Sequence, residues 1–509
     1  MAQTTVSELD YLKMTAWQKF CYKFTGFFKR LPLLFLNFFK ITIPAKAKKF
    51  WQTVKGCGLT VGRAAKYGDW KTRTSFILFG FSQLARKQWL RGVLLLVFEL
   101  VFILYMALFG GQYLGLLGSL GKLERGEHLD EYGNWVYSEG DNSLLILLYG
   151  ILTIMFIICF VYAWYKSIKS AYGTQLMVEA RRKLATAKED INALNDEQYH
   201  KTLLAVPLAG LTIFTIIPII FMIFLAFTNY DQYHMPPTKL FTWIGWDNFA
   251  NVFGSGLSQA ENFGYTFARL LLWTVIWALF ATFSNYILGM IVAIIINKKG
   301  IRFKKLWRTI LVMTIAVPQF VSLLLMSQML GDNGAINKLL EGCGLIQPGN
   351  PIPFLTDGTL AKVTIIVVNI WIGIPYTMLI STGILMNIPE DLYESAKIDG
   401  AGPVKAFFKI TLPYMLHVTA PYLITQFIGN LNNFNVIYLL TGGGPLTSEF
   451  TGGAGKTDLL ITWLYKLVMQ KQLYGMAAVI SILMFIVTAV VSLIVYNRSS
   501  AVKNEEDFM

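Results

Sequence analysis

The sequence predicts an all-α, polytopic membrane protein with about eight transmembrane helices. Of its 509 residues, 55% are hydrophobic and only 15% are charged, whereas globular chains carry roughly 25% charged residues. The charges are missing from long runs, each close to or above the roughly 20 residues that an α-helix needs to cross a bilayer. None of these runs alternates with the period of two that a barrel strand would show. This pattern disfavours a large soluble protein with buried core helices.

The expected spans fall into a strong and a weak group. Six runs contain no Asp, Glu, Lys or Arg, namely 143–165, 202–230, 270–297, 309–331, 363–389 and 474–496. Two weaker runs complete the set: 92–110, which carries only Glu99, and 410–441, which carries only His417. An acid in the middle of a span is by default a functional candidate. Since no chain of other intramembrane acids accompanies Glu99, we expect a neutral or paired structural role for it.

The distribution of positive charge predicts the orientation. With the N-terminus in the cytoplasm and eight spans, the inward segments hold 34 of the 44 Lys and Arg, and the outward loops hold eight. Without the long N-terminal segment the count is still 18 against eight. Basic residues collect on the cytoplasmic side of membrane proteins, so both termini are expected there. The net charge of +14 is thereby explained without nucleic acid.

The N-terminal segment, residues 1–88, shows no cleavable signal peptide and is expected to be retained. Apolar and basic residues interleave at helical spacing within it: Trp17, Phe20, Cys21, Phe24, Phe27, Phe28 and Leu31 with Lys19, Lys23, Lys29 and Arg30. A basic amphipathic helix on the inner leaflet would explain both faces. Disorder and packing against another subunit remain open alternatives.

The most informative stretch is the expected cytoplasmic loop 387–412. Its motif residues are Glu394, Ala396, Asp399, Gly400 and Ala401, followed by Ile410-Thr411-Leu412-Pro413. Gly400 would permit a tight turn after a short helix, and Pro413 would restart the chain into the membrane. The pattern resembles the EAA coupling loop of ABC importer permeases. The alternative interpretation is a polar connector without a binding role. The resemblance implies that Glu394, Ala396, Asp399 and Gly400 couple the chain to an ATPase subunit.

Motifs on both sides extend this resemblance over roughly residues 200–496. They are Asn369-Ile370-Trp371-Ile372-Gly373-Ile374-Pro375-Tyr376, Gly429-Asn430-Leu431-Asn432-Asn433, Thr441-Gly442-Gly443-Gly444-Pro445, Thr457-Asp458-Leu459-Leu460 and Tyr474-Gly475-Met476-Ala477-Ala478. Together they are similar to the larger permease subunit of maltose/maltodextrin ABC importers. The resemblance implies four parts: a cytoplasmic basic segment 1–88, two helices and a linker in 89–201, a type I permease core of six helices in 202–496, and a cytoplasmic tail 497–509.

The resemblance also implies a sugar site. The positions that contact sugar in that family fall on Asn369, Gly373, Tyr376, Asn430 and Asn433. Amide side chains offer donors and acceptors to sugar hydroxyls, and intramembrane asparagines must face protein or water. Gln426 and Gly429 depart from the enterobacterial pattern of a serine and an aromatic residue, which leaves the choice of sugar open. Asparagines that only join helices are the alternative.

The implied function is the membrane-spanning subunit of an ATP-driven carbohydrate importer. The expected partners are a second homologous permease, two ATPase subunits that hold ATP and Mg²⁺, an extracellular sugar-binding lipoprotein and the lipid bilayer. No cofactor is expected on this chain, because the phosphate-loop-like Gly455-Lys456-Thr457 has Phe450 where the motif requires glycine. The alternatives are a permease for another oligosaccharide, an ion-coupled secondary transporter and a membrane scaffold. The short outward loop 231–265 suits a Gram-positive-type system in the plasma membrane.

Overall fold

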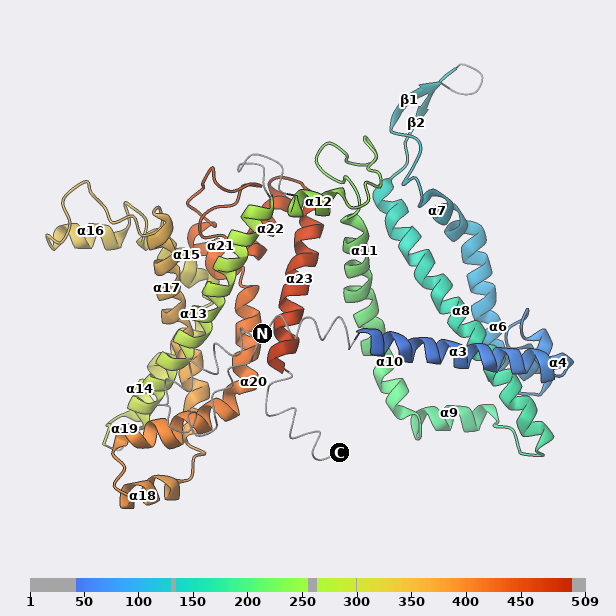
Figure 1. The fold of residues 1–509 in the computed structure, drawn as a ribbon, viewed down its shortest axis with the longest axis horizontal. Coiled ribbons are helices and arrows are strands. Elements are labelled where there is room, and N and C mark those ends of the chain that lie inside the picture. The colour runs from blue at the N-terminus through green and yellow to red at the C-terminus, as the bar shows by residue number, and fades with distance from the viewer. Residues whose placement is uncertain (1–42, 130–133, 255–262, 299, 497–509) are drawn as a thin grey trace, which may run out of the picture. The chain divides into compact units, whose positions relative to one another are not determined.

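The computed structural model describes residues 43–129, 134–254, 263–298 and 300–496, and it confirms a helical protein, with one small β-hairpin (Figure 1). Contacts divide the chain into two compact units, residues 1–118 with 147–217 and residues 119–146 with 218–509. The amphipathic helix predicted around residues 17–31 and the predicted tail 497–509 lie outside the described residues. The division into four parts remains a prediction.

The first unit is built from two long membrane-type helices and shorter helices beside them. Its elements are α3 (Ile43–Tyr67), α4 (Trp70–Thr74), α5 (Phe81–Ala85), α6 (Trp89–Tyr105), the π-helical turn η2 (Met106–Gly110), α7 (Gly111–Leu116), most of α8 (Ser143–Glu179), α9 (Ala187–Asn195), α10 (Tyr199–Leu211) and the π-helical turn η3 (Thr212–Ile216). The segment from α6 to α7 is helical throughout, because η2 joins the two without a break.

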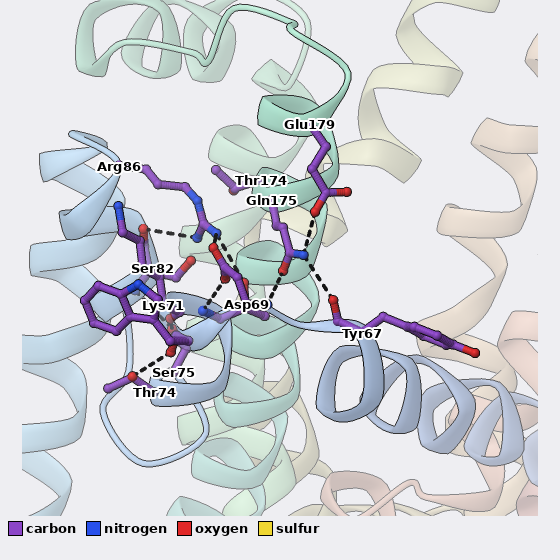
Figure 2. Close-up of polar contacts among 12 residues, drawn as sticks. Tyr67, Asp69, Lys71, Thr74, Ser75, Ser82, Arg86, Thr174, Gln175 and Glu179 are labelled. Atoms are coloured by element: carbon purple, nitrogen blue, oxygen red, sulfur yellow. Dashed lines mark hydrogen bonds and ion pairs between the residues drawn. The ribbon is translucent and has the colours of Figure 1, made fainter.

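A polar cluster fastens the segment around α4 to helix α8, as Figure 2 shows. The Asp69 carboxylate accepts a hydrogen bond from the Thr72 amide at 2.8 Å and pairs with Arg86 at 2.7 Å. Gln175 of α8 accepts from the Asp69 amide at 2.9 Å and donates to the Tyr67 carbonyl at 3.1 Å. Burial acts to raise the pKa of Asp69, but the bonds from Thr72 and Arg86 outweigh it and hold the pKa below its ordinary value. Part of the predicted cytoplasmic segment is therefore packed against a membrane helix.

Glu99 makes a structural contact with the backbone, and whether it is neutral or charged stays a prediction. Glu99 is 5% exposed, and its Oε2 accepts a hydrogen bond from the Phe79 amide at 2.8 Å. A buried backbone donor left without a partner is costly, so the carboxyl group stabilises the chain where the segment before α5 meets α6.

The second unit contains the remaining elements. They are β1 (Gly126–Leu129) and β2 (Trp135–Ser138), then α11 (Ile217–Leu225), α12 (Asp247–Phe253), α13 (Phe263–Asn297), α14 (Lys304–Met313), the 3₁₀ turn η5 (Thr314–Ala316), α15 (Gln319–Met329), α16 (Ala335–Gly342), α17 (Gly358–Leu385), α18 (Glu390–Ile398), α19 (Pro403–Ala406), the π-helical turn η6 (Phe407–Thr411), α20 (Leu412–Leu431), α21 (Asn435–Thr441), α22 (Leu460–Met469) and α23 (Tyr474–Tyr496). The two strands pair antiparallel, with Glu127 opposite Tyr137.

Six helices in the described part of the chain are long and apolar enough to cross a membrane. They are Trp89–Leu116, Ser143–Glu179, Tyr199–Leu225, Phe263–Asn297, Gly358–Leu385 and Tyr474–Leu493. A bent pair of helices over 304–329 would make a seventh. The predicted seventh span, 410–441, is occupied by α20 and α21, which carry His417, Gln426 and Asn430 among their apolar residues. The predicted count of eight is therefore approximate.

The span predicted over 309–331 is not one straight helix. The helical segments Lys304–Ala316 and Gln319–Met329 meet at an angle of 88°. Pro318 has no N–H to donate and disfavours the helical conformation of the residue before it, and Val317 is extended. The break places Gln319 at the start of α15.

Helices α13, α17 and α20 lie side by side and form the centre of the second unit (Figure 1). A buried cluster that includes Trp277, Ala281, Ile365 and Val368 joins them. A Cβ atom on Gly289 of α13 would overlap Thr377 of α17, so glycine permits the close approach of these two helices.

The loop after α21 is held by a buried ion pair. Lys466 of α22 donates to the Asp458 carboxylate at 2.6 Å, and the two side chains are 4% and 0% exposed. Burial raises the pKa of Asp458, while the Lys466 ammonium and the Gly455 amide oppose that rise. Gly443, at φ 79°, lies so close to this carboxylate that a Cβ would overlap it. Two of the sequence motifs thus pack against each other and shape a loop.

We predict that Asp458→Ala strongly destabilises the protein, because it leaves the Lys466 ammonium buried without a counter-charge. Removing one partner of a buried pair costs about 3–5 kcal/mol, which thermal unfolding of the purified full-length chain in detergent would measure. The control is the double variant Asp458→Leu, Lys466→Met, which removes both charges and should recover most of the loss. An unchanged melting temperature in Asp458→Ala would contradict this role for the pair.

Candidate functional site

A cavity of about 440 Å³ lies among α13, α17 and α20, with Gln319 of α15 at its edge. All five residues predicted as a sugar site line it: Asn369, Gly373 and Tyr376 from α17, Asn430 from the end of α20, and Asn433 from the short link after α20. Residues from two separate predicted spans therefore face one cavity. Helix α13 contributes a third wall, with Thr282 and Asn285, which the sequence analysis did not identify.

Asn430, at the end of α20, and Asn433, in the link to α21, already hold parts of the protein together. Asn430 Nδ2 donates to Thr282 Oγ1 of α13 at 3.0 Å. Asn433 Nδ2 donates to Asn430 Oδ1 at 3.2 Å, and Asn433 Oδ1 accepts from the Val436 amide at 3.2 Å. The alternative role, in which asparagines join helices, is therefore present at Asn430 and Asn433. It does not exhaust the donors, since each amide carries a second N–H.

Asn369 and Asn285 differ, because their side-chain amides make no hydrogen bond within the described residues. Asn369 is 6% exposed, and its Nδ2 is buried without a partner. Asn285 Oδ1 is buried without a partner as well. Leaving a buried polar group unsatisfied costs about 1–3 kcal/mol. A polar ligand in the cavity would relieve this cost at a donor and at an acceptor.

Gly373 sets the width of the cavity at this point. A Cβ atom on residue 373 would overlap the side-chain amide of Asn285. The Thr377 hydroxyl donates to the Asn285 carbonyl at 2.8 Å and fixes the two helices at this height. Glycine at 373 is therefore what allows the Asn285 amide to lie against α17.

Tyr376 and the two departures from the enterobacterial pattern also line the cavity. Tyr376 is 46% exposed and borders both this cavity and a neighbouring one of about 430 Å³. Gln426 adds another amide, and Gly429 leaves open space where a side chain would stand. Compared with a serine and an aromatic residue, the cavity thus gains an amide at residue 426 and gains space at residue 429.

No charged side chain lines this cavity within the described part of the chain. Its polar groups are amides and hydroxyls, which hydrogen-bond neutral solutes without adding net charge. Nor does any group of three His, Cys, Asp or Glu in the described ranges suit a metal ion. The arrangement can therefore bind a neutral, hydroxyl-rich molecule.

A signal for the missed wall was present in the sequence. Thr282 and Asn285 are polar residues three positions apart in the uncharged run 270–297. Residues three apart share one face of a helix, so these two residues mark a polar face within that apolar run.

The predicted coupling loop forms a short exposed helix, α18. Helix α18 ends at Ile398, and Gly400 just beyond it has φ 71°. The Ala401 amide donates to the Ala396 carbonyl at 2.8 Å and the Gly400 amide to the Lys397 carbonyl at 3.1 Å. These two bonds define a Schellman turn, which confirms the tight turn predicted at Gly400. Glu394, Asp399 and Gly400 are exposed and Ala396 is half-buried. Their contact with an ATPase remains a prediction.

The predicted restart of the chain at Pro413 is wrong. Helix begins again at Pro403, in the first turn of α19, and continues through η6 into α20 without a break. Pro413 lies within this run, directly after the π-helical turn η6. Such turns often accommodate a residue that cannot complete the regular bonding pattern. One helical run therefore leads from the turn after α18 to Asn430.

Comparisons with known proteins give the following similarities. The family model described as the binding-protein-dependent transport system inner membrane component matches residues 285–503. The galactooligosaccharides transport system permease protein of Bacillus subtilis is 37% identical over 84% of this chain and 97% of its own. The maltodextrin transport system permease protein of Streptococcus pneumoniae is 35% identical over 84% and 96%. A crystal structure of a bacterial ABC transporter involved in alginate import is 25% identical over 60% of this chain and 96% of that one, with a TM-score of 0.48.

We predict that Gly373→Ala lowers the thermal stability of the protein, because the new methyl group overlaps the Asn285 amide. Overpacking of this kind costs about 1–3 kcal/mol. Gly383→Ala on the same helix is the matched control, since a Cβ there meets nothing within 4 Å, and alanine favours helix by up to about 1 kcal/mol. Equal melting temperatures for the two variants would contradict the close approach of α13 to residue 373.

Proposed function

The chain belongs to the family of binding-protein-dependent transport system inner membrane components, and we propose that it forms, with a second permease, the membrane path for maltose or maltodextrin in an ATP-driven importer. Members of this family are transport subunits that work with a second permease and a substrate-binding protein. The chain is accordingly an integral membrane transport subunit and not an enzyme.

The observation that carries the substrate class is the uncharged cavity with an unpartnered donor on Asn369 and an unpartnered acceptor on Asn285. A sugar ring offers neighbouring hydroxyls, each of which donates and accepts. The ring also has an apolar face, against which the exposed ring of Tyr376 can pack. An ion-coupled carrier would need intramembrane carboxylates in its path, and none lines this cavity among the described residues.

The continuous helical run supports the proposed coupling to ATP. The run from Pro403 to Leu431 extends roughly 40 Å at 1.5 Å per residue and joins the turn after α18 to Asn430. The Tyr393 hydroxyl of α18 shares a hydrogen bond with Thr411 at 2.8 Å, which ties α18 to the same run. A displacement of α18 by an ATPase would therefore move the α20 wall of the cavity relative to α13 and α17.

The proposed assembly has two ATPase subunits, which hold ATP and Mg²⁺, and no cofactor on this chain. An extracellular sugar-binding lipoprotein delivers the substrate. Both termini lie in the cytoplasm, as the distribution of Lys and Arg indicates. The relatives from Bacillus subtilis and Streptococcus pneumoniae are matched almost over their full length, which supports a Gram-positive-type system.

Galactooligosaccharides are a second candidate substrate, because the relative named for them is as similar to this chain as the maltodextrin permease is. Both sugars are neutral oligosaccharides, and the open space at Gly429 is compatible with either. Uptake of each labelled sugar by cells that express the complete importer decides between them.

We predict that Asn369→Ala and Asn430→Ala each lower sugar uptake by about tenfold or more, which corresponds to the loss of one hydrogen bond to substrate. Basal ATPase activity should remain, because the nucleotide site lies on another subunit. The matched control is Asn432→Ala, since Asn432 is exposed at the end of the same helix and does not line the cavity. Unchanged uptake in both cavity variants, or an equal loss in Asn432→Ala, would refute the site.

We predict that Glu394→Lys abolishes uptake and co-purification of the ATPase while the chain remains in the membrane. An acid at a docking cleft gains a charge-assisted bond with a basic partner residue, and lysine reverses this attraction. Glu341→Lys, an exposed acid on α16, serves as the control and should transport normally. Normal assembly and uptake in Glu394→Lys would contradict a docking role for α18.

A further inference from the structure

Three cations from separate parts of the second unit converge on one small cavity of about 120 Å³. They are Arg269 of α13, Lys362 of α17 and Lys456 of the loop between α21 and α22, and we call them the cationic pocket. The cavity is much smaller than the amide-lined cavity and has room for a single small anionic group.

Aromatic side chains hold two of the three cations in place. The Lys362 ammonium lies 4.7 Å from the centroid of the Trp273 ring, and the Arg269 guanidinium lies 6.0 Å from that of Tyr265. Both distances are within the range of a cation–π interaction. The stem of Lys456 packs over Gly358, where a Cβ atom would overlap it. These contacts therefore hold the three cationic side chains close together.

None of these three cations forms an ion pair with another described residue, whereas other cations of the same unit do. Lys466 pairs with Asp458, Lys239 with Glu124 and Arg125 with Glu139. Like charges close together repel one another. No residue in the described ranges neutralises the charge of the cationic pocket, so a counter-charge would have to come from another molecule.

The pocket lies at the opposite end of α17 from the coupling helix. Lys362 is near the first residue of α17, and α18 follows its last residue, Leu385. A membrane-spanning helix separates the two, so the pocket faces outward when α18 faces the ATPases. Outward loops of membrane proteins are depleted of Lys and Arg, which makes three converging cations there unexpected on topological grounds alone.

We propose that the cationic pocket receives a carboxylate side chain of the external substrate-binding protein and thereby fixes that protein over the sugar cavity. This rests on the proposed function, because a binding protein delivers substrate from the side opposite the ATPases. Complementary charges at an interface chiefly set association rate and orientation. The pocket accordingly raises the affinity of docking and leaves the steps after docking unchanged.

The test uses the complete transporter in lipid nanodiscs, titrated with its soluble, sugar-loaded binding protein, with stimulated ATPase activity as the signal. In Lys362→Gln, Lys456→Gln, the half-saturating concentration of binding protein should rise about tenfold at an unchanged maximal rate. The strong salt dependence expected for the native transporter should flatten. Lys338→Gln removes an exposed cation of α16 outside the pocket and should behave as the native transporter does.

A shift below twofold in the double variant, or an equal shift in Lys338→Gln, would overturn the proposal. So would a half-saturating concentration that changes only when phosphatidylglycerol replaces phosphatidylcholine, because the pocket would then hold a lipid phosphate. If the double variant does not assemble, Lys456→Gln and Lys456→Arg test the same point, and only the arginine variant should keep native docking. A native transporter that no sugar-loaded binding protein stimulates would instead contradict the proposed function.

Discussion

A membrane interior offers no water to a polar side chain, and this constraint organises the second unit. Each amide or hydroxyl on α13, α17 and α20 must find a protein partner or face a cavity. Asn430 and Asn433 find partners in Thr282 and the start of α21. Asn285 and Asn369 do not, and both line the cavity. Asn430 and Asn433 thus use part of their hydrogen-bonding capacity to join the helices and still line the cavity, whereas Asn285 and Asn369 leave theirs to a solute.

The breaks in the helices serve this cavity. Pro318 ends one helical segment and sets Gln319 at the cavity edge, while α20 ends beside Asn433. Irregular backbone at membrane depth is tolerated where it lines a cavity. The unbroken run from Pro403 to Leu431 has the opposite role, because a stiff element is needed to carry a displacement from α18 to the α20 wall. Irregular segments therefore lie where the cavity binds a solute, and a regular helix lies where a displacement must be transmitted.

The sequence predicted the helical class, six of the long spans and the five residues that the structure brings to one cavity. Uncharged runs and short motifs carry that information locally. The bend at Pro318 and the restart at Pro403 were missed, because hydropathy does not distinguish a straight span from a broken one, and several prolines compete for each boundary. Asn285 was missed for another reason: its importance depends on Gly373, a residue 88 positions later, whose missing side chain lets the amide approach. Proximity between distant segments is decided by packing.

The central claim is that the uncharged cavity among α13, α17 and α20 holds the transported sugar. It is tested most directly by a structure of the complete importer with its sugar-loaded binding protein, trapped with ATP bound. The account predicts density for a sugar ring within hydrogen-bonding distance of Asn369 and Asn285, with the Tyr376 ring against one face. Sugar density elsewhere in the membrane region, with Asn285 and Asn369 bonded to protein groups, would contradict it.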